Sequence, residues 1–445
     1  MILIKHIILS DLGDEKYLLI NSLDGRIDKI GQPVVDTLNK WRGLDNIVPE
    51  NEFETSLYNA LLSKGYIINN RAEEEARKNE IISILRTNHQ ANAKICKAIT
   101  FILTYDCNFR CPYCYEGEIT SKKAIMTPEQ IDAALHFAGD SVTTIGLFGG
   151  EPLMPSCRSS LEYLISKTRD KSYHITTNGY YLEEFYDTLS PLNITSINVT
   201  LDGDEEAHNK RRYLADGSPT YKKVMRGIEK YLVSSIPICI RMNLDNSNSK
   251  VGYDLRKHLM DRFSKHSDYL TFEMSPMLTS DYNEKTNIVE ELYELNAQAS
   301  HDDQLRQNQL LGRSSPIMNA ITLGKKIHPT YSYCFAHAGN TYLVDPYGYI
   351  YPCLIAAGIE DLAIGTYYPE VNLKENSVHD RNIETIPKCR SCEYSLLCGG
   401  GCPIRLPSYD DLLKPECMYT RSLIHVMLPK IYKINEAAKT KKNDA

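Results

Sequence analysis

Apolar positions alternate between short extended runs and helical spacing through the middle of the chain. A continuous apolar run at residues 98–103 predicts a strand. A helix start is predicted at Thr127-Pro128-Glu129, where an N-cap hydroxyl, a first-turn proline and an early acid follow one another. The same patterns predict strands at residues 144–148, 174–176, 197–201, 237–244 and 270–274, and helices at residues 161–168, 221–232 and 253–263. Repeated βα units of this length predict an α/β unit over residues 97–320, with a parallel sheet and helices outside it.

The two ends of the chain have other patterns. Short apolar runs at residues 2–4, 17–20, 26–30 and 66–68 predict strands, and residues 34–41, 54–62 and 72–86 have helical spacing or helical composition. Strands followed by short helices predict a winged-helix-like domain over residues 1–92. Residues 325–426 are rich in Cys, Gly, Pro and Tyr and can form little core, so bound metal would organise them. Residues 427–445 are expected to complete a helix and then continue, from Asn435, as a disordered lysine-rich tail.

Composition narrows the class of protein. The 445 residues are 42% apolar and 24% charged, which is typical of a soluble globular protein. A net charge of −7 gives no general attraction for nucleic acid or an anionic membrane. No apolar run has the length of a membrane span, and the N-terminus reads as a strand rather than a signal peptide. We therefore expect a cytoplasmic protein with no nucleic-acid or membrane partner.

The thirteen cysteines are clustered, which in a cytosolic chain favours metal ligation over disulfides. Cys96, Cys157 and Cys239 lie outside the clusters and are expected to be small buried residues. The first cluster has CxxxCxxC spacing and consists of Cys107, Cys111 and Cys114. Three thiolates so close can hold three irons of a [4Fe–4S] cluster and leave the fourth iron open to a ligand. The alternative is a zinc site with a distant fourth ligand.

This spacing resembles the signature of the radical S-adenosylmethionine (SAM) enzymes. The resemblance implies a partial (β/α)6 TIM-like barrel in which the open iron binds the amino and carboxylate groups of SAM. One electron then yields a 5′-deoxyadenosyl radical that abstracts hydrogen from the substrate, and a reductase, flavodoxin or ferredoxin supplies that electron. The segment Gly149-Gly150-Glu151-Pro152, after the second strand, resembles the GGEP element of the family, which contacts the methionyl amino group.

Other polar residues at strand ends complete the SAM site that the resemblance implies. The stretch from His208 to Arg212, followed by Gly217 and Thr220-Tyr221, resembles the HDxxR…G…TY pattern of members that modify peptides and proteins. Arg212 matches the arginine that pairs with the SAM carboxylate, whereas Asn209 replaces the usual Asp and puts a charge role there in doubt. The implied SAM contacts also include Tyr113 beside the adenine and, at strand ends, Asn178, Asp202 and Asn243, with Arg241 as a weaker candidate.

Seven further cysteines have the spacing Cx13Gx4C, a gap, then Cx2Cx5Cx3Cx14C. This order resembles the SPASM extension of radical SAM enzymes, which binds two auxiliary [4Fe–4S] clusters and would bring the total to three. The resemblance assigns an outer cluster to Cys389, Cys392, Cys398 and Cys417, and an inner cluster to Cys334, Cys353 and Cys402. The inner cluster lacks a fourth cysteine, so one iron stays open or takes another ligand, for which His328 and His337 are candidates. Two zinc sites are the alternative.

The N-terminal domain resembles the PqqD-like recognition element of peptide maturases, which takes a leader peptide as an added strand beside its three-stranded sheet. A DNA-binding winged helix or a packing domain is the alternative, but a slight excess of acids disfavours phosphate contact.

Together these resemblances imply a maturase that modifies a ribosomal precursor peptide, with a thioether first among the possible crosslinks. Aromatic cyclophane formation, epimerisation and sulfatase maturation are alternatives. Leu354 stands where sulfatase maturases have a catalytic Asp, which disfavours that reaction. A scaffold without catalytic activity, holding iron–sulfur or zinc sites beside a DNA-binding winged helix, is the alternative of another class. No catalytic acid or base is identified.

Overall fold

The computed structural model describes residues 1–277 and 326–443 apart from residues 94, 118, 120, 338 and 376, together with Glu291 and Ile317. Most of the predicted central unit beyond Met277 therefore lies outside the described residues. The chain forms two compact units. The first comprises Met1–Ala91, Asn296–Cys334 and Arg381–Ala445, and the second comprises Asn92–Leu295 and Phe335–Asp380.

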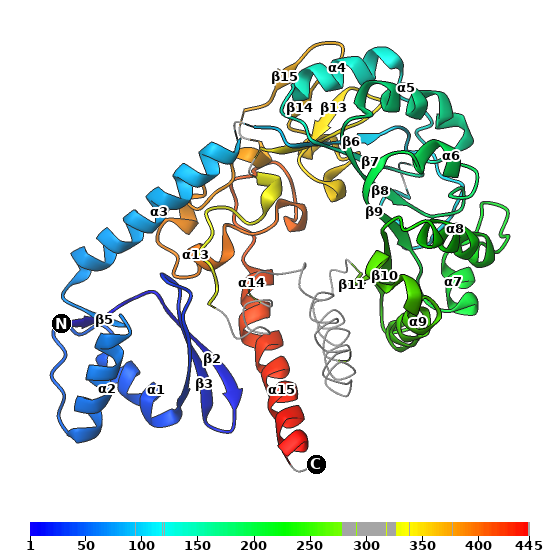
Figure 1. Ribbon diagram of the computed structural model, residues 1–445. Coiled ribbons are helices and arrows are strands. Elements are labelled where there is room, and N and C mark those ends of the chain that lie inside the picture. The colour runs from blue at the N-terminus through cyan, green and yellow to red at the C-terminus, as the bar shows by residue number, and fades with distance from the viewer. Residues whose placement is uncertain are drawn as a thin grey trace. The chain divides into compact units, whose positions relative to one another are not determined.

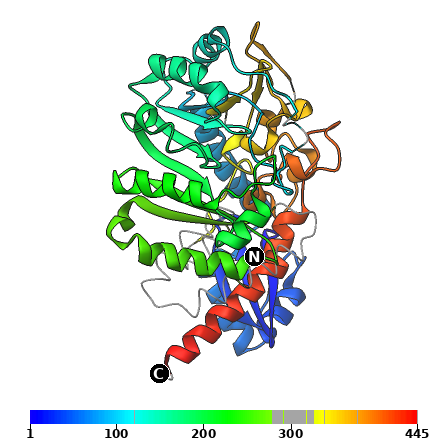
Figure 2. The same cartoon turned by 90° about the vertical axis from the view of Figure 1, so that its right-hand side faces the viewer.

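The second unit is built on a ten-stranded, mostly parallel sheet, which confirms the predicted α/β class. Its parallel part consists of β6 (Ala98–Ile102), β7 (Thr144–Phe148), β8 (Ser172–Thr177), β9 (Asn193–Thr200), β10 (Ile238–Leu244) and β11 (Leu270–Pro276), paired in this order. The intervening helices are α4 (Pro128–Ala138), α5 (Arg158–Thr168), α6 (Tyr186–Leu189), α7 (Glu205–Arg211), α8 (Tyr221–Val233) and α9 (Ser249–Arg262). Figure 1 shows these helices along the outer side of the curved row of strands, and Figure 2 shows the same layering after a quarter turn.

Alternating burial explains why this sheet has two different faces. Val199 and Met242 are fully buried, and Gly179 leaves room for Val199 to meet Val224 of α8. Neighbouring strand positions such as Asn198 and Arg241 are half-exposed and point away from the helices. The apolar side of each strand therefore packs on the helices, and the other side carries polar groups.

Part of the cysteine-rich C-terminal region continues this sheet. β12 (Thr341–Val344) pairs in parallel with β6, and β13 (Tyr349–Tyr351), β14 (Gly365–Thr366) and β15 (Asn372–Leu373) follow antiparallel. Short 3-10 turns also belong to the second unit: η1 (Pro155–Cys157), η2 (Ser264–Tyr269), η4 (Phe335–His337), η5 (Leu354–Ala356), η6 (Glu360–Leu362) and η7 (Val378–Asp380). The predicted domain over residues 325–426 is thus divided, because residues 335–380 group with the sheet and residues 381–426 with the first unit.

The first unit has a three-stranded antiparallel sheet of β2 (Ile7–Gly13), β3 (Lys16–Asn21) and β4 (Ile27–Gly31). The apolar pattern predicted a strand at residues 2–4, ahead of those at residues 17–20 and 26–30. Instead, β1 (Ile2–Leu3) pairs with β5 (Ile67–Ile68), and β2 takes the place in the sheet. The β2–β3 turn at Asp14 and Glu15, both with positive φ, fixes that register.

Helices cover both faces of the small sheet. α1 (Gln32–Trp41), α2 (Glu52–Ser63) and the long α3 (Arg71–Ala93) follow the strands in sequence. The buried Leu19 packs with Trp41 and Tyr66 on one face. On the other face, Ile8 and Ile20 pack against Leu428 of α15 (Leu428–Asn443). Figure 1 shows α15 and the pair α1 and α2 on opposite sides of the strands.

The remaining elements of the first unit are short except for the C-terminal helix. They are α13 (Ser395–Cys398), α14 (Met418–Ser422), the 3-10 turns η8 (Pro387–Cys389) and η9 (Pro403–Arg405), and the π-helical turn η10 (Leu423–Met427). α15 continues to Asn443, although the sequence predicted a disordered tail from Asn435. Its Ala, Glu and Lys residues are good helix formers, so helical propensity extends through the polar end. No helix among the described residues has the length and apolar character needed to span a bilayer.

Candidate active site

The cysteine loop leaves the carboxyl end of β6, where short local hydrogen bonds shape it. The Asp106 N–H donates to Thr104 Oγ1 at 3.1 Å, and the Cys107 N–H donates to Asp106 Oδ1 at 3.0 Å. The Phe109 N–H donates to Cys107 Sγ at 3.4 Å, so the first thiol already has a backbone donor. The loop is therefore organised by its own backbone before any ligand binds.

The three cysteines of the loop are half-buried. Cys111 interacts electrostatically with both Cys107 and Cys114. Burial raises the pKa of Cys107 to about 12 and that of Cys114 to about 11. Thiolate ligation to a metal would release the protons of these thiols. As they stand, the described residues contain no group of three or more Cys, His, Asp or Glu side chains that could hold a metal ion.

The glycine turn after β7 packs directly on the start of this loop. The Gly150 N–H donates to Thr104 O at 3.1 Å, and the Glu151 N–H donates to Asp106 O at 2.9 Å. A Cβ added at Gly150 would lie 2.2 Å from Tyr105 O. The resemblance to the GGEP element led us to expect these glycines beside a bound ligand. In the structure they allow close approach of the cysteine loop itself.

Glu151 is fully buried and joins the ends of the second and third parallel strands. Its carboxylate accepts hydrogen bonds from Thr177 Oγ1 at 2.7 Å, the Asn178 N–H at 2.7 Å and the Leu153 N–H at 2.9 Å. Burial raises the pKa of Glu151, and these hydrogen bonds oppose the rise. The side chain therefore fixes the Asn178 turn in place.

Asn178 in turn reaches the cysteine loop. Its Nδ2 donates to Asn108 Oδ1 at 2.8 Å and lies 3.7 Å from Cys107 Sγ. Asn108 was not among the predicted site residues, and its place inside the CxxxCxxC segment is the signal that could have found it. Pro152, in the glycine turn, is buried next to Glu151.

Arg212, Tyr113 and Asp202 form a hydrogen-bonded chain beside the thiols. Arg212 Nη1 donates to the Tyr113 hydroxyl at 2.7 Å, and that hydroxyl donates to the buried Asp202 carboxylate. Burial disfavours the Arg212 cation, but Tyr113, Cys111 and Asp202 outweigh it and raise the pKa of Arg212. Arg212 Nε is buried and has no hydrogen-bond partner within the described residues. The site thus holds a permanent positive charge with a spare donor.

A compact scaffold holds the Arg212 backbone in position. Thr220 Oγ1 donates to Arg212 O at 2.5 Å and lies 3.1 Å from His208 Nε2. Asn209 Oδ1 accepts the N–H groups of Thr220 and Tyr221 at 2.9 and 3.0 Å. A neutral amide oxygen is sufficient for this role, so replacing Asp with Asn at this position keeps the acceptor.

Asn243 contacts the site through its backbone, because its N–H donates to Asp202 Oδ1 at 3.0 Å. Its side-chain Oδ1 accepts from Arg241 Nε at 3.2 Å. Arg211, which sequence analysis did not single out, stacks its guanidinium over the Tyr113 ring at 4.9 Å and pairs with Asp245 at 2.6 Å. The position of Arg211 next to Arg212 in the sequence is the signal that could have identified it as a site residue.

The sheet face opposite the helices carries polar side chains on neighbouring strands. Arg241 Nη1 donates to Glu273 Oε1 at 2.9 Å, and Arg241 Nη2 donates to Ser275 Oγ at 3.2 Å. On neighbouring strands, Asn198 Nδ2 lies 3.1 Å from His174 Nε2. These side chains are half-exposed, whereas the interior of a parallel sheet is normally apolar. This polar face is thus suited to a polar ligand at the carboxyl ends of the strands.

Four C-terminal cysteines form a second thiol group within the first unit. Cys389 interacts electrostatically with Cys392, Cys398 and Cys417, and burial raises its pKa to about 12. Cys398 ends α13, and the left-handed Gly399 turns the chain directly after it. The four residues predicted for the outer cluster are therefore brought together.

The three cysteines predicted for the inner cluster are divided between the units. Cys334 and Cys402 both interact with Tyr333 in the first unit, whereas Cys353 belongs to the second. The two candidate histidines divide in the same way, because His328 falls in the first unit and His337 in the second.

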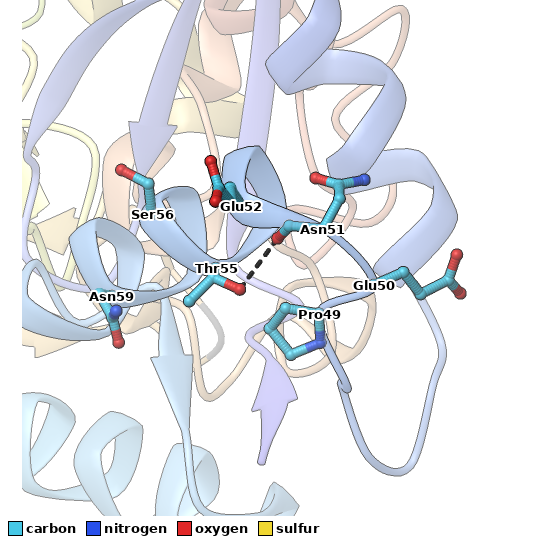
Figure 3. A pocket seen from close by; sticks show the side chains of 7 residues that line it. All are labelled: Pro49, Glu50, Asn51, Glu52, Thr55, Ser56 and Asn59. Carbon is cyan, nitrogen blue, oxygen red and sulfur yellow. Dashed lines mark hydrogen bonds between the residues drawn. The ribbon is translucent and has the colours of Figure 1, made fainter.

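A separate open hollow lies at the beginning of α2 in the first unit (Figure 3). Its lining consists of Pro49, Glu50, Asn51, Glu52, Thr55, Ser56 and Asn59. Asn51 caps the helix by accepting the Glu54 N–H, and Thr55 Oγ1 donates to Asn51 O at 2.9 Å, as the dashed line shows. The polar groups of the hollow form hydrogen bonds at the start of α2, and none of the clustered cysteines lines the hollow.

Comparison with known proteins finds a family match for the part of the chain that contains Cys107, Cys111 and Cys114. Residues 101–247 match the radical SAM superfamily. The radical SAM cyclopropyl synthase TigE of Paramaledivibacter caminithermalis is 24% identical over 90% of this chain and 89% of its own length. The cysteine-type anaerobic sulfatase-maturating enzyme of Clostridium perfringens is 23% identical over 66% of this chain and 85% of its own length.

A solved structure shows the same fold. Native anSMEcpe with bound AdoMet and Cp18Cys peptide aligns with a TM-score of 0.55 at 19% identity, covering 79% of this chain and 100% of that one. The matched residues 101–247 include the cysteine loop, the glycine turn and Arg212. The chain is therefore similar, over residues 101–247, to the radical SAM superfamily of enzymes.

Proposed function

We propose that this protein is a radical SAM maturase that modifies a ribosomally synthesised precursor peptide. The observation that carries the proposal is the half-buried cysteine loop beside the Arg212 cation, in which Cys111 interacts with Cys107 and Cys114 and against which the Gly150 turn packs. In this proposal Cys107, Cys111 and Cys114 hold a [4Fe–4S] cluster. With SAM bound, such a cluster supplies reductive cleavage of the sulfonium and abstraction of hydrogen from the substrate.

The surrounding residues are proposed to bind and orient SAM. Arg212 pairs with the SAM carboxylate, since its Nε is a buried donor without a partner among the described residues. Asp202 holds the Tyr113 hydroxyl, and the Tyr113 ring is proposed to flank the adenine with the face that Arg211 does not cover. The Gly149–Pro152 turn faces the SAM amino group through its backbone. The Glu151 side chain positions Asn178 and does not supply a free charge.

The second thiol group is proposed to hold auxiliary iron–sulfur clusters. Cys389, Cys392, Cys398 and Cys417 supply the four thiolates of the outer one, and their mutual proximity supports this assignment. Cys334, Cys353 and Cys402 supply an inner one. Clusters held at these cysteines would supply an acceptor for the surplus electron after hydrogen abstraction, and a reductase, flavodoxin or ferredoxin would be the external electron donor.

The precursor peptide is proposed to bind in two places. Its leader adds a strand beside β4, an edge strand whose residues are half-exposed and pair only with β3 within the described residues. Its core segment binds the polar face that contains Arg241 and Glu273. The peptide bound to anSMEcpe supports a peptide substrate for this fold.

The bond formed is proposed to be a crosslink within the peptide, a thioether first and a carbon–carbon bond second. The likeness to a cyclopropyl synthase along 90% of the chain supports the carbon–carbon outcome. Sulfatase maturation is a second candidate, favoured by the likeness to the maturating enzyme of Clostridium perfringens. Leu354, directly after Cys353, supplies no carboxylate for that reaction and favours the peptide maturase.

Anaerobic reconstitution tests the proposal. Protein loaded with iron and sulfide, then given dithionite and SAM, should produce 5′-deoxyadenosine. Replacing Cys107, Cys111 and Cys114 by alanine should abolish this product, while the control Cys96→Ala should keep it because Cys96 lies outside the clusters. Anaerobically purified protein that contains zinc but no iron or sulfide would refute the proposal. Mass spectrometry of the co-expressed precursor then distinguishes thioether, carbon–carbon and sulfatase-type products.

A further inference from the structure

Arg381 is a buried cation inside the second thiol group. Its side chain is among the largest in the chain that are essentially inaccessible, with 1% of its surface exposed. Arginine stays protonated in proteins, so this guanidinium carries a full charge away from water. Such a charge is strongly unfavourable unless an anion or several acceptors compensate it.

The contacts of Arg381 anchor it to the two segments that hold cysteines. Its Nη2 donates to Gly400 O at 3.1 Å and to Gly401 O at 3.3 Å, between Cys398 and Cys402. Its Nη1 donates to Lys414 O at 2.9 Å, three residues before Cys417. These three acceptors are neutral carbonyl groups. Within the described residues, Arg381 forms no ion pair with a carboxylate, and its buried Nε has no hydrogen-bond partner.

The groups that interact electrostatically with Arg381 are mainly cysteine side chains. Cys402 of the proposed inner cluster interacts with it most strongly, followed by Cys389 and Cys398 of the outer cluster, and Glu416 contributes more weakly. Three consecutive left-handed glycines, Gly399 to Gly401, allow the chain to fold around this point. The position of a Cβ at Gly400 is 4.0 Å from Cys389 Sγ, so the carbonyl anchor lies against a thiol. These cysteines would therefore supply the counter-charge of Arg381 only as thiolates bound to a metal, because burial raises the pKa of Cys389 to about 12 and that of Cys398 to about 11.

We propose that Arg381 is the positioning and electrostatic residue of the outer auxiliary cluster, and that its buried charge sets the reduction potential of that cluster. The inference rests on the proposed function, since it requires iron–sulfur clusters at these cysteines. A [4Fe–4S] cluster with four thiolates is anionic and becomes more so on reduction. A buried cation nearby stabilises the reduced form more than the oxidised form, because charges interact strongly at low dielectric. Arg381 thus makes the outer cluster a better electron acceptor.

The test uses the reconstituted full-length protein and needs no peptide. The reduction potential of the outer cluster is measured by redox titration followed by electron paramagnetic resonance, with iron and sulfide counted per chain. Arg381→Gln removes the charge and should lower the potential by about 59 mV or more, a tenfold shift for a one-electron couple. Arg381→Lys keeps the charge and should stay closer to the wild type. The control Arg86→Gln removes an exposed arginine paired with Glu384 and should not change the potential.

If Arg381→Gln fails to load iron, a second variant that removes a negative charge near the same cysteines tests the electrostatic effect. Glu416 is buried beside the same cysteines, and its Oε1 accepts the Tyr419 N–H at 3.0 Å, which glutamine can also accept. Glu416→Gln should raise the potential because it removes a negative charge. Loaded variants with unchanged potentials would overturn the inference and leave the proposed function intact. Wild-type protein without iron at these cysteines would instead refute the auxiliary clusters themselves.

Discussion

Arg212 donates a hydrogen bond from Nη1 to the hydroxyl of Tyr113 at 2.7 Å, which links a residue that follows α7 to the centre of the cysteine loop. The two residues are 99 positions apart in sequence. Their contact fixes a permanent cation beside the cysteine loop, and the role proposed for it is to pair with the carboxylate of SAM. It also means that the ring of Tyr113 cannot move without releasing Arg212.

Arg212→Gln should weaken SAM binding. A hydrogen bond to a charged group contributes about 1.5–3 kcal/mol, so the Kd for SAM should rise roughly tenfold to 100-fold. Equilibrium binding of SAM to the reconstituted protein measures the change. Arg110→Gln is the control, because Arg110 donates only to backbone carbonyl groups of its own loop. Equal affinities of the wild type and Arg212→Gln would contradict the role given to Arg212.

Gly150→Ala should prevent the cysteine loop from closing. The added Cβ would lie 2.2 Å from Tyr105 O and 2.4 Å from Asp106 O, and neither backbone atom can move without shifting Cys107. We expect the variant to lose most of the iron of the first cluster. Iron content and the 5′-deoxyadenosine yield check this. Gly31→Ala is the matched control, since its nearest neighbour to an added Cβ is at an ordinary 3.7 Å.

The sequence predicted the parallel sheet because its apolar runs are local signals. The strand over residues 144–148 was predicted with the bounds that β7 has. The pairing of β12 with β6 was not predicted, because it joins residues more than 240 positions apart. In the first unit, residues 1–10 are apolar almost throughout, so the pattern could not distinguish β1 from the start of β2.

The same distinction between local sequence signals and long-range contacts applies to the candidate site. Spacing alone selected Cys107, Cys111 and Cys114, and in the structure Cys111 interacts electrostatically with the other two, although the described residues contain no ready metal-holding group. The pairing of Arg241 with Glu273 depends on the register between β10 and β11, which no local pattern encodes. The environment of Arg381 likewise depends on carbonyl groups from two distant turns. Ligand motifs are therefore readable from sequence, whereas the charges that surround them require the fold.

Cys417→Ser should remove the outer cluster and leave the first one in place. Cys417 is the exposed member of its group, so the substitution disturbs little packing. The iron count should fall by about four per chain, the content of one [4Fe–4S] cluster. Formation of 5′-deoxyadenosine from SAM should persist, while modification of the precursor peptide should be lost. Full iron content in Cys417→Ser would contradict the ligand assignment.

Glu74 provides a pH-dependent part of the stability of the first unit. Burial alone would raise its pKa, but hydrogen bonds from His6, Arg71 and the Lys5 N–H lower the pKa to about 2. A carboxyl group with a depressed pKa stabilises the folded state above its unfolded pKa of about 4.3, and this contribution is lost as the pH falls towards 2. Glu74→Gln should therefore cost roughly 2 kcal/mol at pH 7, and the deficit should shrink below about pH 4. Glu73→Gln is the control, since its exposed pair with Arg77 contributes at most about 1 kcal/mol.

The fluorescence of Trp41 measures this effect directly. Trp41 is the only tryptophan in the chain, and it is buried in the same core as Ile4 and Ile67 of the first unit. Urea unfolding followed at this residue reports on that unit, whatever happens to the parallel sheet. The difference in unfolding free energy between the wild type and Glu74→Gln should be largest near neutral pH, where Glu74 is ionised in both the folded and unfolded states. A difference that stays constant from pH 7 to pH 3 would show that the carboxylate acts through packing alone.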